Sequence, residues 1–125
     1  MLLVREKGKT DKRAVLEILR ELIDPGVPMN LEEMGIISSE WIHVHDDVVQ
    51  VEFRPTSHVC PVGLAIGVVI KDALERGLGT DVEVRMRRGS HLQEGLVNDL
   101  LGDREQYSKA LERLRGSGFV RRCHK

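Results

Sequence analysis

The chain has 125 residues, of which 41% are hydrophobic and 31% are charged, and its formal net charge is −1. This length fits one domain with its own core, and the mixed, nearly balanced charge excludes any strong attraction to nucleic acid or a membrane surface. No apolar run approaches the roughly 20 residues that span a membrane. Two cysteines, Cys60 and Cys123, are too few for a disulfide scaffold and are typical of a cytoplasmic protein with free thiols.

The N-terminal half predicts one helix followed by a hairpin. We expect a mobile N-terminal segment over 1–10 and a single domain over 11–125, because residues 1–10 carry basic side chains but no signal-peptide core. Helical spacing predicts an amphipathic helix over 11–23, followed by a loop over 27–30. Alternation of apolar and polar residues predicts two strands, over 40–45 and 48–54, joined by a tight turn.

The C-terminal half completes a β-α-β unit and adds helices. A helix over 61–76 and a strand over 81–87 follow the hairpin, so the strands on either side of this helix should be parallel. Helices are predicted over 91–101 and 104–115, opened by the possible caps Ser90 and Asp103, and a closing strand over 119–123. The predicted fold class is α/β (α+β): a single small domain of order α-β-β-α-β-α-α-β, with a short mixed sheet covered by helices.

This topology brings three polar segments to one edge of the sheet. The loops after the two parallel strands share the carboxyl edge, where α/β proteins usually place their sites. The expected segments are Asp24 to Asn30, Thr56 to Cys60, and Gly89-Ser90-His91. Gly63 and Gly67 lie one turn apart on the intervening helix, and their cost in helix stability predicts a close approach to another backbone, that of the sheet.

Cys60 is the residue on which the functional interpretation depends. Pro61 suits a first helical position, so Cys60 is predicted to cap the helix, where the dipole lowers the pKa of a thiol. The alternative is a small, buried, apolar cysteine. A metal set of Cys60, His58 and His91 competes with the interpretation of these as ordinary loop residues. A catalytic Cys–His pair would need an orienting carboxylate, for which Asp24 is the candidate.

Two further groups of side chains suit either solvent or a ligand. His43 and His45 share one strand face, which is compatible with a metal but typical of a solvated sheet face. Arg85, Arg87 and Arg88 form a basic patch that fits a solvated strand end or an acidic partner surface.

Four segments resemble one protein family. They are Asp24-Pro25-Gly26-Val27-Pro28-Met29-Asn30 with Met34-Gly35-Ile36-Ile37, then Thr56-Ser57-His58-Val59-Cys60-Pro61, Gly89-Ser90-His91, and residues 98–105. The chain is similar, over about residues 12–123, to SufT-type proteins and the eukaryotic cytosolic iron–sulfur assembly (CIA) targeting subunits. It departs from the CIA branch at His58, which lies two residues before Cys60, whereas in that branch the histidine directly precedes the cysteine. It also lacks the long N-terminal extension of the eukaryotic subunits.

The resemblance implies a non-catalytic iron–sulfur cluster assembly or client-targeting factor of the cytoplasm. Cys60 would be its reactive residue, with Thr56 and His58 beside it, and the supporting loops would be Asp24, Pro25, Pro28, Asn30, Gly89, Ser90 and His91. Partners would be apo iron–sulfur clients and other assembly factors, and some members form homodimers. A partner surface is expected at Asn98, Asp103, Arg104 and Glu105. No resident cofactor is predicted, and a transient iron–sulfur cluster, iron or zinc at Cys60 stays open, as do a cysteine-dependent enzyme and a metal-binding module.

Overall fold

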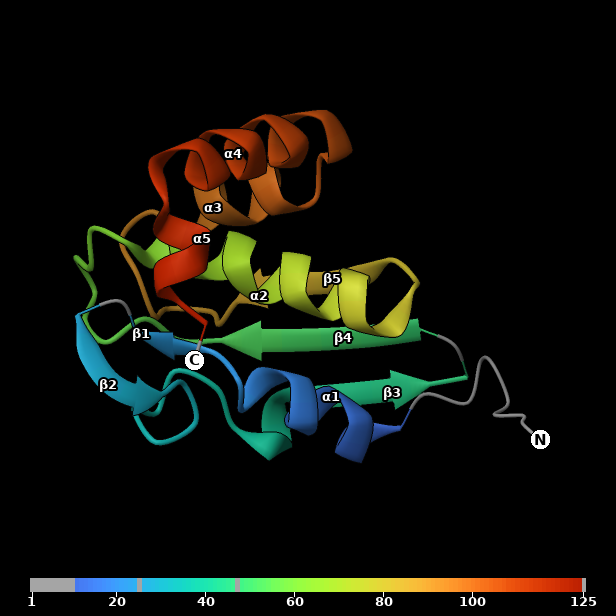
Figure 1. Ribbon diagram of the computed structural model, residues 1–125. Coiled ribbons are helices and arrows are strands. Elements are labelled where there is room, and N and C mark those ends of the chain that lie inside the picture. Colours follow the sequence, from blue (N-terminus) through green and yellow to red (C-terminus); the bar gives the residue numbers. More distant parts are fainter. Residues whose placement is uncertain (1–10, 25, 47, 125) are drawn as a thin grey trace.

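The structure is a computed structural model that describes residues 11–24, 26–46 and 48–124. The predicted N-terminal segment over 1–10, and Pro25 among the expected loop residues, therefore lie outside the described residues. The described residues form five α-helices and two small sheets, and Figure 1 shows α2 lying along the larger sheet with α3 and α4 above it. The α+β class expected from the sequence is confirmed.

The larger sheet has the order β3-β4-β5 and contains both kinds of strand pairing. β3 (Ile42–His45) runs antiparallel to β4 (Val48–Phe53), and β4 runs parallel to β5 (Val82–Met86). α2 (Gly63–Leu78) connects the two parallel strands, so the predicted hairpin and β-α-β unit are both present. The loops that follow β4 and β5 consequently lie at the same edge of the sheet.

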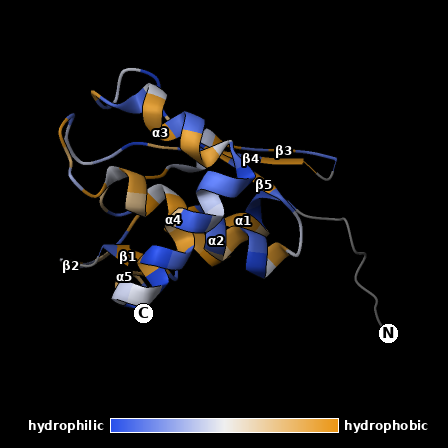
Figure 2. Cartoon of the chain, turned by 90° about the horizontal axis from the view of Figure 1, so that it is seen from above, coloured by the Kyte–Doolittle hydropathy of each residue, from blue (hydrophilic) through white to orange (hydrophobic). Residues whose placement is uncertain are grey.

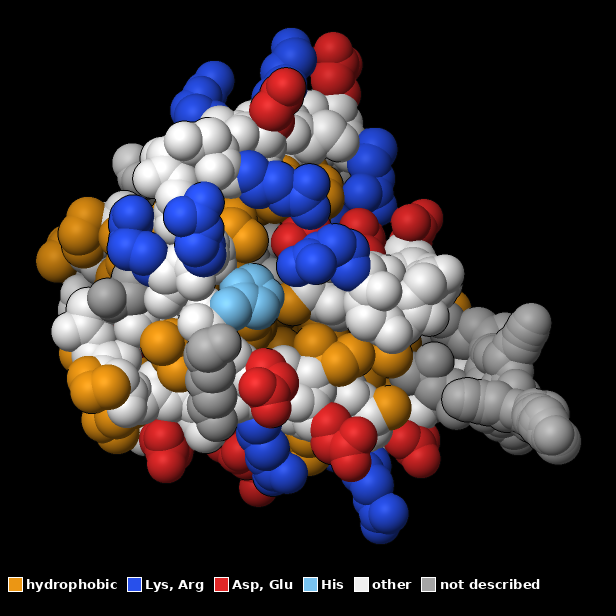
Figure 3. All heavy atoms as spheres, viewed as in Figure 1, with side chains coloured by type: hydrophobic (Ala, Val, Ile, Leu, Met, Phe, Trp, Pro, Cys, Tyr) orange, Lys and Arg blue, Asp and Glu red, His pale blue; other side chains and the backbone are white. Residues whose placement is uncertain are grey.

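One core fills the space between the sheet and the helices. Val49, Val51 and Phe53 from β4 and Val82, Val84 and Met86 from β5 are buried against α2. Hydrophobic and hydrophilic residues alternate around the helices in Figure 2, as amphipathic helices on a shared core require. On the face seen in Figure 3, basic and acidic side chains are interspersed, in keeping with the balanced net charge.

The first helix is shorter than predicted because its last turn is used for strand pairing. α1 (Lys12–Leu19) ends four residues before Ile23. Ile23 belongs to β1 (Ile23–Asp24), which pairs with β2 (Val27–Asn30), a segment predicted to be a loop. The Ile23 N–H also donates to the Cys123 carbonyl at 2.8 Å, which joins the end of the chain to its beginning.

The predicted closing strand over 119–123 is wrong. The segment forms the short helix α5 (Phe119–Arg122), and the only strand-like contact here among the described residues is an isolated bridge between Leu22 and His124. Phe119 and Val120 are both buried, and consecutive buried side chains fit a helix better than a strand, whose side chains alternate between faces. Gly118, at φ +85°, ends α4 and redirects the chain.

Two predicted helix starts are also wrong, and one is confirmed. α2 begins at Gly63 with Val62 in the cap position, and turns at Cys60 N–H to Ser57 O and Gly63 N–H to Cys60 O delay the helix beyond Pro61. α3 (Glu94–Leu101) begins after Gln93, and no side chain caps it. Asp103 does cap α4 (Arg104–Ser117), accepting from the backbone N–H groups of residues 105 and 106.

A reciprocal cap that the sequence analysis missed closes the turn after β2. Asn30 Oδ1 accepts from the Glu33 N–H at 2.8 Å, and Glu33 Oε1 accepts from the Asn30 N–H at 3.0 Å. This is a capping box with Asn in place of Ser or Thr. Its signal, Asn followed three residues later by Glu, was present in the sequence. The contact gives Asn30 a structural role.

The close approach predicted at Gly67 is confirmed, but its partners are side chains. A Cβ at Gly67 would lie 2.8 Å from Phe53 Cζ and 3.1 Å from Leu101 Cδ1, and one at Gly63 would lie 3.1 Å from Met86 Cε. The two glycines therefore let α2 settle onto the aromatic and thioether side chains at the ends of β4 and β5.

Replacing Gly67 by Ala should lower the free energy of unfolding, because Phe53 and Leu101 would have to move. Overpacking of this kind costs about 1–3 kcal/mol, and the better helix propensity of Ala returns only about 1 kcal/mol of that. The matched control is Gly95→Ala in α3, where nothing lies within 4 Å of the added Cβ and stability should rise. Urea unfolding of both variants measures the difference; equal stabilities would contradict the close-packing argument.

Candidate functional site

The loops after β4 and β5 meet at the carboxyl edge of the sheet, as predicted. Arg87 N–H donates to Phe53 O at 2.8 Å, Leu92 N–H donates to His58 O at 3.0 Å, and His91 Nε2 lies 3.0 Å from Cys60 O. Thr56 to Cys60 and Gly89 to His91 are thus held together by backbone contacts. Figure 1 also places β1 and β2 at this end of the molecule, but no hydrogen bond between described residues joins them to the Cys60 loop.

Cys60 lies at a small cavity with an apolar rim. The residue is 9% exposed, and the cavity has a volume of about 280 Å³. Its other lining residues include Val59, Pro61, Leu64, His91, Leu92 and Val97. Leu92, Leu96 and Val59, at 76%, 67% and 65% exposed, are the most exposed large hydrophobic residues of the described chain. The thiol therefore lies in a hollow that is bordered by the exposed side chains of Val59 and Leu92, and we call this hollow the Cys60 cavity.

His91 fixes the backbone at Cys60 and forms no hydrogen bond with the thiol. Its Nδ1 accepts from the Gln93 N–H at 3.0 Å, so the neutral ring carries its proton on Nε2 and donates it to the Cys60 carbonyl. Neither ring nitrogen is then available to a metal or to the sulfur in this arrangement. Within the described residues no side chain forms a hydrogen bond with Cys60 Sγ, so this geometry provides no base for a Cys–His pair.

The remaining candidate ligands do not gather around the thiol. His58 and Thr56 are exposed and face a second hollow on the other side of the loop. In the part of the chain that the structure describes, no group of three or more His, Cys, Asp or Glu side chains is placed to hold a metal ion. His43 and His45 lie exposed on β3, beside a hollow that they share with Lys12 and Gln50.

Asp24 lies near the other cysteine. Its Oδ1 accepts from the Gly26 N–H at 2.7 Å, which closes the β1–β2 turn. Burial, together with the negative charge of Asp24, raises the pKa of the Cys123 thiol to about 11. Cys123 is 2% exposed and its carbonyl anchors Ile23, so Asp24 and Cys123 belong to the closure of the chain ends and not to the Cys60 cavity.

A polar hollow of about 500 Å³ lies on the opposite side of the Cys60 loop. We call it the arginine groove, and its lining residues include Arg54, Thr56, Ser57, His58, Arg87 and Arg88. Arg54 and Arg87 both lie over the Trp41 ring, with Cζ 5.5 Å and 4.3 Å from its centroid. Ser90 was predicted to cap the helix. Its Oγ donates instead to the Arg87 carbonyl and supports the turn.

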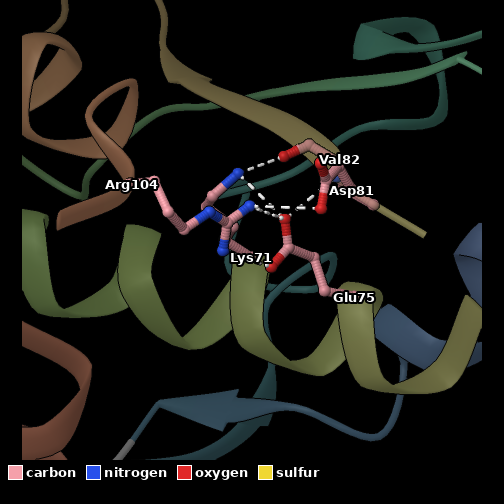
Figure 4. A network of polar contacts seen from close by, with 5 residues as sticks. All are labelled: Lys71, Glu75, Asp81, Val82 and Arg104. Atoms are coloured by element: carbon pink, nitrogen blue, oxygen red, sulfur yellow. Dashed lines mark hydrogen bonds and ion pairs between the residues drawn. The ribbon is translucent and has the colours of Figure 1, made fainter. Parts of the chain in front are cut away.

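Three of the four residues expected at the partner surface have structural roles. Asn98 is 7% exposed, and its amide bonds both the N–H and the C=O of Met86, at 2.7 and 3.2 Å. It therefore joins α3 to β5 and is not part of a surface. Arg104 donates to both carboxylate oxygens of Glu75, at 3.1 and 3.0 Å, and pairs with Asp81 (Figure 4). Asp103 caps α4, and Asp103, Arg104 and Glu105 are all exposed at the start of this helix, so a partner surface at these three residues stays a prediction.

Sequence reasoning missed the surroundings of both hollows. Arg54 and Trp41 were not identified as a pair. Trp41 precedes β3 and Arg54 follows β4, and only the antiparallel pairing of these strands brings the two residues together. Leu92 and Leu96 fall within the helix predicted over 91–101, and no exposed apolar side chains were predicted there. The helix begins at Glu94, so Leu92 precedes it, and both leucines are exposed.

Comparison with known proteins places this site in a family. A sequence model described as iron–sulfur cluster assembly protein matches residues 12–86. Over 117 residues the chain is 32% identical to MIP18 family protein galla-2 of Drosophila melanogaster and 33% identical to cytosolic iron–sulfur assembly component 2B of Mus musculus. These alignments cover 90% of this chain and 75% and 72% of those proteins. Protein AE7 of Arabidopsis thaliana is 30% identical over 106 residues, with 82% and 68% of the two chains covered.

The fold and the loop around Cys60 define a small α+β domain of the iron–sulfur assembly type. The chain belongs to the iron–sulfur cluster assembly protein family, in the branch of the MIP18 and cytosolic iron–sulfur assembly component 2B proteins. The resemblance drawn from its sequence motifs is thereby confirmed. None of the helices within the described residues is both long and apolar enough to cross a membrane.

Alkylation should separate the two thiols. Cys123 is nearly inaccessible and its pKa is raised to about 11, so little of it is thiolate near neutral pH. Cys60 opens onto a cavity, and we expect iodoacetamide to modify it faster in the native protein. Mass spectrometry of peptides over a time course at neutral pH measures both rates, with the unfolded protein as the control for intrinsic reactivity. Equal rates in the native protein would contradict the assignment of Cys60 as the accessible thiol.

Asn98 and Asp103 should differ in their contributions to stability. Asn98→Ala leaves the Met86 N–H and C=O without their partner in a buried place, which costs about 1–3 kcal/mol. Asp103→Ala removes an exposed helix cap and should cost about 1 kcal/mol. Chemical denaturation of the two variants tests the order. A smaller loss for Asn98→Ala than for Asp103→Ala would show that the β5 contact is not stabilising.

Proposed function

We propose that this protein is a non-catalytic factor in the maturation of cytosolic iron–sulfur proteins. It would bind apo clients and other assembly proteins, and Cys60 would be its functional residue, with Thr56 and His58 in the same loop. The observation that carries the proposal is the position of Cys60 at the carboxyl edge of the sheet, beneath an exposed apolar rim. Family membership supports the pathway, because relatives from Mus musculus and Dictyostelium discoideum bear the name cytosolic iron–sulfur assembly component 2B.

The surroundings of Cys60 favour binding over catalysis. A catalytic thiol requires a base within hydrogen-bond reach, and His91, the nearest imidazole by its contacts, donates to the Cys60 carbonyl instead. The exposed side chains of Val59 and Leu92 border the Cys60 cavity and form the kind of apolar surface that marks protein contacts. A partner seated there would cover the rim and approach the thiol together.

Binding of a second copy of the chain and binding of a metal are secondary proposals. The loops that contain Pro28, Gly89 and Ser90 would shape the surface that a partner or a second copy contacts, without touching the thiol. If a cluster, iron or zinc is carried, Cys60 would supply one ligand and the partner the others, since the described residues do not assemble a complete set.

Complementation tests the role of Cys60. In a host strain that lacks its own homologue, Cys60→Ser should fail to restore the activities of cytosolic iron–sulfur enzymes, because the functional thiol is gone. Cys123→Ala is the matched control: it removes the other buried thiol, and we expect it to support maturation as long as the protein folds. Enzyme activities are measured together with protein level and circular dichroism. Full recovery with a folded Cys60→Ser protein would contradict the proposal.

A further inference from the structure

The arginine groove contains two guanidinium groups, those of Arg54 and Arg88, that form no ion pair among the described residues. Arg87 pairs with Glu52 at 2.9 Å. Arg54 has only the Gly35 carbonyl, at 3.4 Å, and the Trp41 ring, and Arg88 forms no ion pair among the described residues. Glu94, the acidic residue closest to the Gly89 turn by its contacts, accepts from the Gly89 N–H at 2.7 Å. The groove therefore has an excess of positive charge in a protein whose net charge is −1.

Two of the guanidinium groups in the groove, those of Arg54 and Arg87, are positioned before any ligand arrives. Arg54 directly follows β4 and Arg87 directly follows β5, and the Arg87 N–H bonds the Phe53 carbonyl, so the two side chains leave the sheet edge side by side. Both are steadied by the same indole, because a guanidinium is attracted to the face of an aromatic ring. Binding an anion then costs less side-chain entropy than it would with free arginines.

From this geometry we propose that the arginine groove binds an acidic segment of a partner protein, through side-chain carboxylates on Arg54 and Arg88. Planar guanidinium groups match carboxylates with paired hydrogen bonds, and the exposed Thr56 and Ser57 border the same hollow. The volume of about 500 Å³ far exceeds the roughly 30 Å³ share of a water molecule, so a single small oxyanion would leave most of the groove empty.

The location of the groove links this inference to the proposed function, on which it rests. The loop 55–60 separates the arginine groove from the Cys60 cavity, with Thr56, Ser57 and His58 lining one hollow and Val59, Cys60 and Pro61 lining the other. A partner with an acidic segment next to an apolar side chain would contact both hollows across one loop. The groove would then select the partner by charge and bring it to the thiol.

Binding of a fluorescein-labelled glutamate octapeptide, measured by fluorescence anisotropy, tests the proposal. The double variant Arg54→Gln with Arg88→Gln should weaken binding by about tenfold or more, since two charged contacts are removed. The matched control is Arg85→Gln, an exposed arginine on β5 that lines a different hollow and should leave the affinity within about twofold. Unchanged binding by the double variant, or an equal loss with Arg85→Gln, would overturn the assignment.

Two further measurements distinguish a peptide site from a small-anion site and separate this proposal from the proposed role of Cys60. Inorganic phosphate should compete only weakly; displacement of the peptide by phosphate at equal concentration would show a small-anion site and overturn the proposal of a peptide site. Cys60→Ser should bind the peptide as tightly as the unmodified protein. Suppose that Cys60→Ser supports iron–sulfur maturation in cells while replacement of Arg54 and Arg88 still weakens peptide binding. That result would contradict the proposed role of Cys60 and leave the assignment of the groove as a peptide site intact.

Discussion

The parallel pairing of β4 with β5 determines the position of everything else in this domain. It requires α2 to cross from one end of the sheet to the other, and the crossing is tight because Gly67 allows Phe53 to within van der Waals contact of the helix backbone. With that packing in place, the loops after the two strands must emerge side by side. The Cys60 cavity and the arginine groove both arise from these two loops. A wider separation between α2 and the sheet would move Cys60 away from His91 and open the cavity into the core.

β5 is an edge strand, and the chain satisfies most of its free side with side chains. Because Arg87 N–H points toward β4, the backbone groups of Val82, Val84 and Met86 point away from it. Lys71 donates to the Val82 carbonyl, Glu75 accepts from the Val82 N–H, and Asn98 bonds both groups of Met86. Burial opposes ionisation of Glu75, but hydrogen bonds from Arg104, Val82 and Lys71 outweigh it and keep its pKa below the ordinary value. Asn98 and Arg104 therefore both stabilise the fold; Asn98 is buried, whereas a partner surface at the exposed Arg104 stays a prediction.

The sequence contained enough information for the order of the elements and for the edge at which the loops meet. Alternation identified β3, β4 and β5, and the cap at Asp103 was evident from residue types and spacing alone. What failed depended on contacts between distant parts of the chain. Leu22 and Ile23 match a helix locally but pair with residues 123–124, and Phe119 and Val120 match a strand locally but both enter the core. Cys60 was predicted to be a helix cap because Pro61 follows it. In the structure its N–H bonds the Ser57 carbonyl and its carbonyl bonds the Gly63 N–H, so these turns precede the helix.

The short loop after β4 borders two chemically different hollows, one polar and one apolar. Between Arg54 and Pro61 the chain turns so that hydroxyl and imidazole side chains face the arginines, whereas Val59 and Cys60 face the start of α3. His91 lies between the two hollows. Its ring bonds the Cys60 carbonyl and the Gln93 N–H, and the adjacent Ser90 bonds the Arg87 carbonyl. In this arrangement hydrogen bonds connect the two hollows, which share no lining residue.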